Sequence, residues 1–541
     1  MSIHNGHRLL SGISVDVIAS LLSLRGVPTI QPFVDDITGD VICFNGQVFA
    51  GLDCLGDQGC DGDAIDDNDT IAVLHALCET DGKKHSVMHV LSRLKGAFSF
   101  VYIRRERSGE ECGDTLWFGR DCFGRRSLLF LDTAYDLSTS DDALYPGFIL
   151  SSTAFQPSAS TVNYDSSCWR EITPGIYSFQ IINSNENVYD AVSASIVFHP
   201  WLSDSAQGVA SPERRRLVLS DSVPPSSDTD AENAIDTIMR VLSIAVRRRV
   251  KAISKHSVEM SANSYAAGTS SEPAAVSILF SGGLDSVVLA ALTNSDRPSC
   301  EPIDLISINF GIKSSADWLA AINSWLELQL LFPQRPWRLV LINVCASDVE
   351  AQRARILRLI APRSTVMDYN IGSAFWFASS GNGYLCDDKG NLLHSNPFVS
   401  AARVVLVGIG ADEQLGGYGR HRTAYDLRSW TGLQAEMEMD FERIWHRNLG
   451  RDDRCISDRG KDARFPYLDE DFVSAVSSLP LWRIADMRLG PGHGDKWVLR
   501  QIAYRLGLKS CSDRVKRAIQ FGSNVAKECN PKFVKGDTPI R

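Results

Sequence analysis

The sequence predicts two domains of different fold class: an α+β domain with antiparallel sheets, followed by an α/β domain with a mostly parallel sheet. A chain of 541 residues is too long for one hydrophobic core, so more than one domain is expected. In the first part, apolar residues alternate with a period of two, as in the segments 98–103 and 116–118, which is typical of antiparallel strands. In the second part, short apolar runs alternate with amphipathic helical patterns, which indicates a parallel sheet covered by helices on both faces.

Two segments of low complexity set the domain boundaries. Residues 203–230 are rich in Ser, Asp, Pro and Arg without periodicity and are expected to form a linker. Residues 256–273 are rich in Ser, Ala and Gly and are expected to be a disordered insertion. We therefore expect a first domain over 1–202, a second over 231–530, and a tail over 531–541.

Composition excludes several classes of protein. The net charge of −10 argues against a nucleic-acid-binding surface, and the basic runs 214–216 and 247–249 are expected to be solvated. No apolar stretch reaches the ~20 residues of a membrane span, and no signal peptide is evident. The 13 cysteines are scattered without a Cys-x-x-Cys pair, which predicts a reduced, cytoplasmic protein without a zinc site.

Elements of the second domain follow from its hydrophobic pattern. Helical spacing of apolar residues predicts a first helix over 231–253. The further candidates are strands over 275–280, 305–310, 338–344 and 403–407, with helices over 315–331 and 348–360. Ligands of such sheets bind beyond the carboxyl ends of the strands.

The first turn that could bind a ligand is Ser281-Gly282-Gly283-Leu-Asp285-Ser286, between a predicted strand and a predicted helix. Unpaired N–H groups and the helix dipole make such a turn an anion site, and glycine allows the backbone to approach the anion closely. An acid beside a phosphate needs a cation, so Asp285 is expected to bind Mg²⁺. The Gly-Lys-Ser/Thr ending of a Walker loop is absent. A glycine-rich turn without a ligand is the alternative.

A second turn, Gly408-Ile409-Gly-Ala-Asp412-Glu413, also follows a predicted strand. Since parallel strands end at the same edge, Asp412 could share one Mg²⁺ with Asp285 against a pyrophosphate group. The alternative is that Asp412 and Glu413 only cap a helix N-terminus, where acids are favoured.

These turns resemble the synthetase domain of asparagine synthetases, which has an ATP-pyrophosphatase fold. The matching motifs occur in order at 281–286, 362–377, 408–418, 463–469 and 495–500. Variant motifs at 408–414, 420–422 and 516–523 resemble a branch of this family, the asparagine synthetase domain-containing proteins.

The resemblance implies a reaction and site residues. In this family, the side-chain carboxylate of aspartate attacks the α-phosphorus of ATP, pyrophosphate leaves, and ammonia then displaces AMP. It implies ATP and Mg²⁺ as cofactors, with Lys516 and Arg454 as cationic groups at the phosphates. The positions that match the adenosine contacts are Leu279, Ile308 and Gly408.

One position departs from the family. Ile409 stands where asparagine synthetases carry a glutamate that serves the second half-reaction, and an alkyl side chain can neither deprotonate nor orient a reactant. We therefore expect amide formation to be weaker than nucleotide binding.

The first domain resembles a class II glutamine amidotransferase, with an Ntn-type antiparallel β-sandwich. Asn45 and Gly46 match that family's oxyanion hole, and Asp69 matches the aspartate that holds the amino group of glutamine. The family begins Met-Cys-Gly-Ile and uses the exposed N-terminal cysteine as nucleophile. The sequence begins Met1-Ser2-Ile3-His4, so either the true start lies upstream and the domain is N-terminally incomplete, or the domain has no glutaminase activity. For the chain as given, we expect no glutaminase activity.

Three functions fit these features. The first is an ATP-dependent amide ligase that takes an aspartate-like acid with ammonia or glutamine nitrogen. The second is a nucleotide-binding pseudoenzyme or scaffold. The third, ATP-dependent RNA modification, is disfavoured by the acidic composition. No nucleic-acid or membrane partner is expected, and the sequence leaves open whether the protein forms a homodimer.

Overall fold

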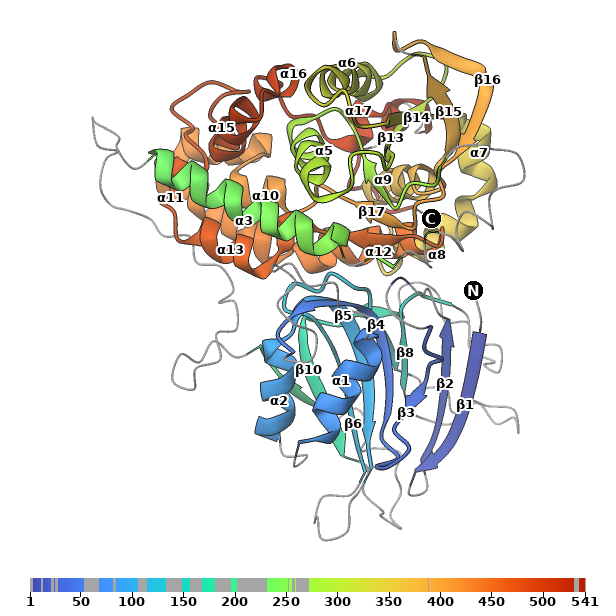
Figure 1. Cartoon of the computed structure of the whole chain (residues 1–541). Coiled ribbons are helices and arrows are strands. Elements are labelled where there is room, and N and C mark those ends of the chain that lie inside the picture. The colour runs from blue at the N-terminus through green and yellow to red at the C-terminus, as the bar shows by residue number, and fades with distance from the viewer. Residues whose placement is uncertain are drawn as a thin grey trace. The chain divides into compact units, whose positions relative to one another are not determined.

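The chain divides into two units, which are described separately (Figure 1). The structure, a computed structural model, describes residues 3–10, 13–20, 24, 28–52, 68–80, 84–105, 114–132, 148–155, 168–180, 196–201, 231–251, 253–254, 258, 272–387, 389–529 and 535–540. Unit 1 comprises Met1–Ser211, Ala361–Arg363 and Trp445–Arg454, and unit 2 comprises Pro212–Ile360, Ser364–Ile444 and Cys455–Arg541. Ser2, the linker 203–230, the basic run 214–216 and most of the insertion 256–273 lie outside the described residues.

Unit 1 is built on antiparallel sheets. The largest has the order β11 (Val197–His199), β10 (Gly175–Gln180), β6 (Thr115–Arg120), β5 (Lys95–Arg104), β4 (Val41–Ala50) and β3 (Phe33–Val34). A second sheet has the order β8 (Phe148–Ser151), β7 (Leu129–Asp132) and β9 (Arg170–Glu171), and β1 (Ile3–Leu10) pairs with β2 (Ile13–Ser20). Helices α1 (Asp69–Cys78) and α2 (Lys84–Arg93) belong to the first part of this unit, and its segment 445–454 contains η4 (Trp445–Leu449) and the start of α12 (Gly450–Ser457).

Period-two alternation distributes the side chains of the large sheet between two cores. In β4, Ile42 and Phe44 belong to the core that includes α1 and α2, whereas Val41 belongs to the core that includes the small sheet. In β5, Phe100 and Ile103 divide in the same way. Successive side chains of a strand point to opposite faces, so each sheet face is apolar. The predicted α+β sandwich is therefore confirmed.

Unit 1 includes two segments that the sequence placed in the second domain, 361–363 and 445–454. The second carries Asp453, whose carboxylate accepts hydrogen bonds from Arg126 Nη1 at 2.8 Å and from the Ser127 backbone at 2.9 Å. Gly450 lies against Glu171, because a Cβ built on Gly450 would fall within 1.4 Å of a carboxylate oxygen of that residue. The amino-acid composition does not change at either segment, so it cannot show that these residues pack with the first unit.

Unit 2 contains a mostly parallel seven-stranded sheet. Its order is β16 (Leu392–Val399), β15 (Asn382–Cys386), β14 (Trp337–Val344), β13 (Ile303–Phe310), β12 (Val276–Leu279), β17 (Val404–Leu406) and β18 (Asp462–Arg464). The five strands from β14 to β18 in this order are parallel, and β15 and β16 add an antiparallel edge. The predicted α/β class is confirmed, and the four strands read from the sequence lie side by side in it.

Helices cover this sheet. Along β13, Ile303 and Leu305 enter the core that includes α5 (Leu284–Asp296) and α6 (Ala316–Leu331). Phe310, of opposite parity in the strand, makes an edge contact with Phe377 of α9 (Val366–Ala378) at 6.3 Å between ring centroids. Side chains of opposite parity face opposite ways, so α9 covers the other face of the sheet.

Two expectations for unit 2 are corrected. The helix expected over 348–360 is two helices, α7 (Ala346–Ala351) and α8 (Arg353–Ile360), because Gln352 departs from helical geometry. Two residues of the run 247–249 are not solvated: Arg248 and Arg249 are buried and pair with Asp469, whereas the Arg247 side chain is 37% exposed and pairs with Asp296. These arginines lie near the end of α3 (Ala231–Lys251), and a sequence pattern does not show which carboxylate will meet them.

Among the described residues, no helix is both long and apolar enough to span a bilayer. The C-terminal residues 535–540 lie beside the start of α9. The backbone N–H groups of Val366 and Met367 donate there to the carbonyls of Thr538 and Gly536. The expected tail therefore includes a segment that satisfies two N–H groups in the first turn of a helix.

Candidate functional site

The glycine-rich turn between β12 and α5 has the geometry of an anion site. Gly283 is the N-cap residue of α5 and has an extended backbone, and no side chain caps the helix there. Gly282 has a φ of +68°, and a Cβ built on it would lie 2.2 Å from the backbone of Ala320. Only glycine can combine this φ with so close an approach of α6. The turn leaves the positive end of a helix of 13 residues without a side-chain cap.

The second turn follows β17 and leads into α10 (Ala411–Leu415). Asp412 and Glu413 lie in its first turn, and the Glu413 carboxylate accepts from the Gly410 backbone at 3.2 Å and from the Tyr418 hydroxyl at 2.6 Å. Glu413 thus has the capping role that the sequence left open. Asp412 has another role, because its carboxylate meets two lysines.

These lysines join the two turns into one group, the carboxylate–lysine cluster of Asp285, Asp412, Lys496 and Lys516. Lys496 Nζ lies 2.6 Å from both carboxylate oxygens of Asp285 and 2.7 Å from Asp412 Oδ1. Lys516 Nζ lies 2.6 Å from Asp412 Oδ2. The two carboxylates therefore come within 2.7 Å of one point, the Lys496 ammonium nitrogen, and a Mg²⁺ shared between them stays a prediction.

The cluster is electrostatically balanced. Burial raises the pKa of Asp412, but the charges of Lys496 and Lys516 outweigh it and hold the pKa below its usual range. Burial likewise lowers the pKa of Lys516, but Asp412 and Asp285 outweigh it and raise the pKa. The cluster thus pairs two carboxyl side chains with two lysines. Next to them, burial and the charge of Asp412 raise the pKa of Glu413 to about 7.

The residues fit a divalent cation bound together with phosphates. Asp412 Oδ1 is buried and accepts no hydrogen bond of good geometry, since its approach to Lys496 is an ion pair only. Gly417 preserves this arrangement, because a Cβ on it would lie 2.1 Å from Asp412 Oδ1. Among the described residues, no group of three or more His, Cys, Asp or Glu side chains could hold a metal. Two carboxylates alone suit Mg²⁺, which commonly takes its other ligands from phosphates and water.

Lys496 is the site residue that sequence reasoning missed. It belongs to the motif at 495–500 but was given no role, because a lysine before a helical pattern is usually a surface charge. In the structure it is only 2% exposed and has a φ of +54°. This left-handed conformation costs roughly 1–2 kcal/mol for a residue with a Cβ. The bond from its backbone N–H to the Leu415 carbonyl, at 2.8 Å, holds it there.

The other predicted positions lie around this cluster or next to it. Leu279 ends β12, and Gly408 follows β17, where a Cβ would come 3.1 Å from the Cβ of Asp285. Ile308 is a buried residue of β13, the neighbour of β12, two residues before the end of the strand. Ser281 is exposed and accepts from the Gly283 N–H at 3.3 Å, and Ser286 donates to the Gly283 carbonyl at 3.1 Å.

Arg454 lies in the other unit from this group, so its expected role at the phosphates stays a prediction. Arg454 belongs to unit 1 and is buried, and its Nη1 donates to Ser127 Oγ at 2.8 Å and lies 3.3 Å from Glu171 Oε1. A guanidinium held by a carboxylate and a hydroxyl in a dry environment is a structural ion pair. Its correspondence to a family lysine did not predict this partner.

The residues of unit 1 that were expected to contact glutamine differ in what they contact within the protein. Asn45 is exposed and pairs with Ser99 in the β4–β5 ladder, next to Gly46. Asp69 is buried in the first turn of α1 and accepts from the Val48 backbone at 3.2 Å. The acid thus joins the helix to the strand that carries Asn45 and Gly46.

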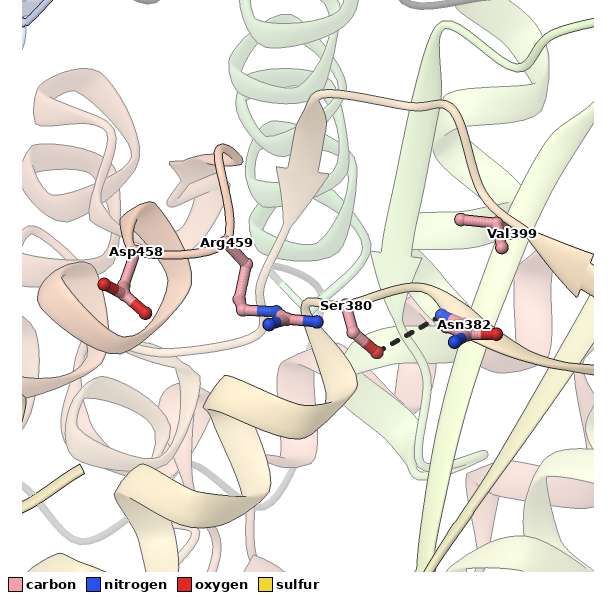
Figure 2. A pocket seen from close by; sticks show the side chains of 5 residues that line it. All are labelled: Ser380, Asn382, Val399, Asp458 and Arg459. Atoms are coloured by element: carbon pink, nitrogen blue, oxygen red, sulfur yellow. Dashed lines mark hydrogen bonds between the residues drawn. The ribbon is translucent and has the colours of Figure 1, made fainter. Parts of the chain in front are cut away.

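A cavity of about 430 Å³ lies elsewhere in unit 2 and is lined by Ser380, Asn382, Val399, Asp458 and Arg459 (Figure 2). Asp458 already accepts from the Trp376 indole at 2.6 Å, and Arg459 lies over that ring at 4.3 Å. The cavity shares no residue with the carboxylate–lysine cluster, so it does not define the site.

Comparisons with known proteins identify the family of this chain. Residues 391–530 match the family model described as asparagine synthase. The chain is 33% identical to asparagine synthetase domain-containing protein 1 of Bos taurus, over 94% of this chain and 88% of that protein. It is 34% identical to the Homo sapiens protein of the same name, over 94% and 87%.

A more distant relative is the putative asparagine synthetase (glutamine-hydrolyzing) 1 of Methanocaldococcus jannaschii, which is 26% identical over 46% of this chain and 37% of that protein. The extended similarity to the first two relatives covers both units, and the matched region of the family model includes Asp412, Lys496 and Lys516. The chain therefore belongs to the family of asparagine synthetase domain-containing protein 1.

Proposed function

We propose that this protein is an ATP-dependent amide ligase of the asparagine synthetase type. The carboxylate oxygen of aspartate or a similar acid would attack the α-phosphorus of ATP, and the bond to pyrophosphate would break. The nitrogen of ammonia, supplied free or from glutamine, would then attack the acyl carbon, lose a proton and displace AMP.

One observation carries this proposal: two carboxylates and two lysines from four separate segments meet beside the uncapped N-terminus of α5. The adenylation step develops negative charge on the phosphorus and on the departing pyrophosphate. Lys496 and Lys516 would neutralise that charge, and N–H groups at the start of α5 would bind phosphate oxygens. Mg²⁺, if held by Asp285 and Asp412, would supply further positive charge to the pyrophosphate.

A second candidate function rests on Ile409. This partly buried residue stands next to the cluster, between Gly408 and Gly410, and supplies no acid or base. A protein that keeps the side chains at the phosphate site but lacks an acid or base at position 409 would bind nucleotide without forming amide. The second candidate is therefore a nucleotide-binding pseudoenzyme or scaffold.

ATP–pyrophosphate exchange tests the first step directly. We expect the full-length protein to exchange radiolabelled pyrophosphate into ATP when aspartate or a related dicarboxylic acid is present with Mg²⁺. Asp285→Asn should reduce Mg²⁺-dependent ATP binding and exchange by at least about a hundredfold, in the range seen when one electrostatic group is lost. The fold should be retained, because Lys496 would keep Asp412 as its partner.

Asp458→Asn is the matched control. Asp458 is a carboxylate of the same unit with a similar exposed fraction, 18% against 15% for Asp285, but it lies outside the cluster. Exchange should survive this change. ATP binding without exchange for any acid tested would favour the pseudoenzyme, and no ATP binding at all would rule out both candidates.

A further inference from the structure

The segment 513–518 joins two parts of the site that are far apart in sequence. It connects α16 (Lys509–Ser512) to α17 (Ile519–Gly522) and carries Arg514, Lys516 and Arg517. Lys516 extends to the carboxylate–lysine cluster, and Arg514 extends to the glycine-rich turn. Two residues of extended chain span only about 7 Å, so the placement of Arg514 constrains that of Lys516.

Arg514 acts on one atom of the turn, the carbonyl oxygen of Gly282. Arg514 Nη1 donates to this oxygen, and Ser324 Oγ of α6 donates to it at 3.1 Å. The peptide unit is planar, with its carbonyl and the following N–H on opposite sides. Fixing the Gly282 carbonyl therefore fixes the Gly283 N–H, which points to Ser281 on the other side of the turn.

A second set of bonds holds these donors in place. Ser324 Oγ lies 3.2 Å from Ser510 Oγ of α16. Ser510 in turn donates from its hydroxyl to Glu327 Oε2 at 2.6 Å and from its backbone to Glu327 Oε1 at 3.0 Å. The start of the segment is thus attached to α6, the helix that packs against Gly282.

We propose that Arg514 is a positioning residue for the phosphate site. It orients the Gly283 N–H of the glycine-rich turn through the Gly282 carbonyl and holds the segment 513–518 so that Lys516 reaches Asp412. The effect of Arg514 on phosphate binding rests on the proposed function. Its effect on the geometry of the turn and of the segment 513–518 concerns the ligand-free protein and is tested separately.

Hydrogen–deuterium exchange of the full-length, ligand-free protein tests the structural part. Arg514→Ala should speed exchange in peptides that cover 281–286 and 513–518. Arg517→Ala removes the same charge from an exposed side chain of the same segment and should leave 281–286 unchanged. Unchanged exchange in Arg514→Ala, or equal effects of both variants, would overturn the proposal.

Binding of Mg²⁺–pyrophosphate, measured by calorimetry, tests the consequence. Arg514→Ala should weaken binding roughly ten- to a hundredfold, the range lost with one charge-assisted hydrogen bond. Arg514→Lys should recover part of the loss, because an ammonium can still donate to the Gly282 carbonyl.

If Arg514→Ala fails to fold, Arg514→Lys and Ser324→Ala supply the same comparison at the Gly282 carbonyl, and no weakening in either would contradict the proposal. Absence of pyrophosphate exchange in the wild-type protein would count against the ligase function, whereas the deuterium measurement would still decide the role of Arg514.

Discussion

The residues that resemble family motifs serve different purposes in the two units. In unit 2 they meet as side chains: Asp285, Asp412, Lys496 and Lys516 contact one another at the end of the sheet. In unit 1 the segment 120–128, which resembles the Arg-Asp-x-x-Gly-Arg-x-x-Leu motif of class II glutamine amidotransferases, mainly holds the backbone. The buried Arg120 guanidinium donates to the carbonyls of Gly124, Arg126 and Ile172.

Asp121, the next residue of that motif in unit 1, accepts from the backbones of Phe98, Phe123 and Arg125. Buried polar groups need such partners, so these residues would be required for folding alone. The difference teaches that the residues of a motif can either stabilise the fold or form a functional site. A motif indicates a site when its charged side chains are directed at one another in an open turn rather than at the backbone.

The largest expected effect separates two lysines within the cluster. Lys496→Met should lower the free energy of unfolding by roughly 3–5 kcal/mol, because it leaves the buried Asp412 and the half-buried Asp285 without their shared partner. Lys516→Met should change it by less than about 1 kcal/mol, since the side chain is 32% exposed, yet reduce pyrophosphate exchange about 10²–10³-fold. Urea unfolding and exchange assays on both variants measure this. Equal destabilisation would show that Lys516 is also structural.

The next effect tests the residue that departs from the family. Ile409→Glu should raise amide formation from ammonia, by about 10² or more if the carboxylate acts as an acid or base. Ile409→Gln is the control, because it has similar shape and polarity without the proton-transfer group. A rise in both variants, or in neither, would mean that the second step is limited elsewhere.

A smaller effect concerns pH and Glu413. Its pKa is raised from 4.5 to about 7, so between these values the folded protein keeps a proton that the unfolded chain releases. The free energy of unfolding should therefore fall as pH rises through this window, by at most about 1.4 kcal/mol per pH unit. Glu413→Gln should remove this slope in urea titrations from pH 5 to 8. An unchanged slope would assign it to other groups.

The smallest effects compare two residues of unit 1. Asp69→Ala should destabilise this unit by roughly 1–2 kcal/mol, because it removes an acceptor of the Val48 N–H and an acid in the first turn of α1. Asn45→Ala, at an exposed position, should change stability by less than about 0.5 kcal/mol. Thermal melts measure both. A large effect of Asn45→Ala would show that this motif too is structural.

Local pattern was sufficient for the elements and for most of the site. The strands β12, β13, β14 and β17 appear in the sequence as short apolar runs. Helices cover both faces of a parallel sheet, so its strands are buried on both sides and are apolar along their whole length. The turns at 281–286 and 408–413 follow two of these strands. Because parallel strands end at one edge, the sequence alone determined that Asp285 and Asp412 would meet.

Only the tertiary structure decided which charges meet those carboxylates. Lys496 becomes a partner because a left-handed backbone, fixed by the Leu415 carbonyl, directs it inward. Arg248, Arg249 and Arg454 become buried ion pairs because carboxylates distant in sequence arrive beside them. A charged side chain is equally stable in water or in a well-made pair, so its residue type does not reveal its environment. Apolar side chains are stabilised only by burial away from water. The sequence therefore determined the sheet, whereas the tertiary structure determined the ion pairs.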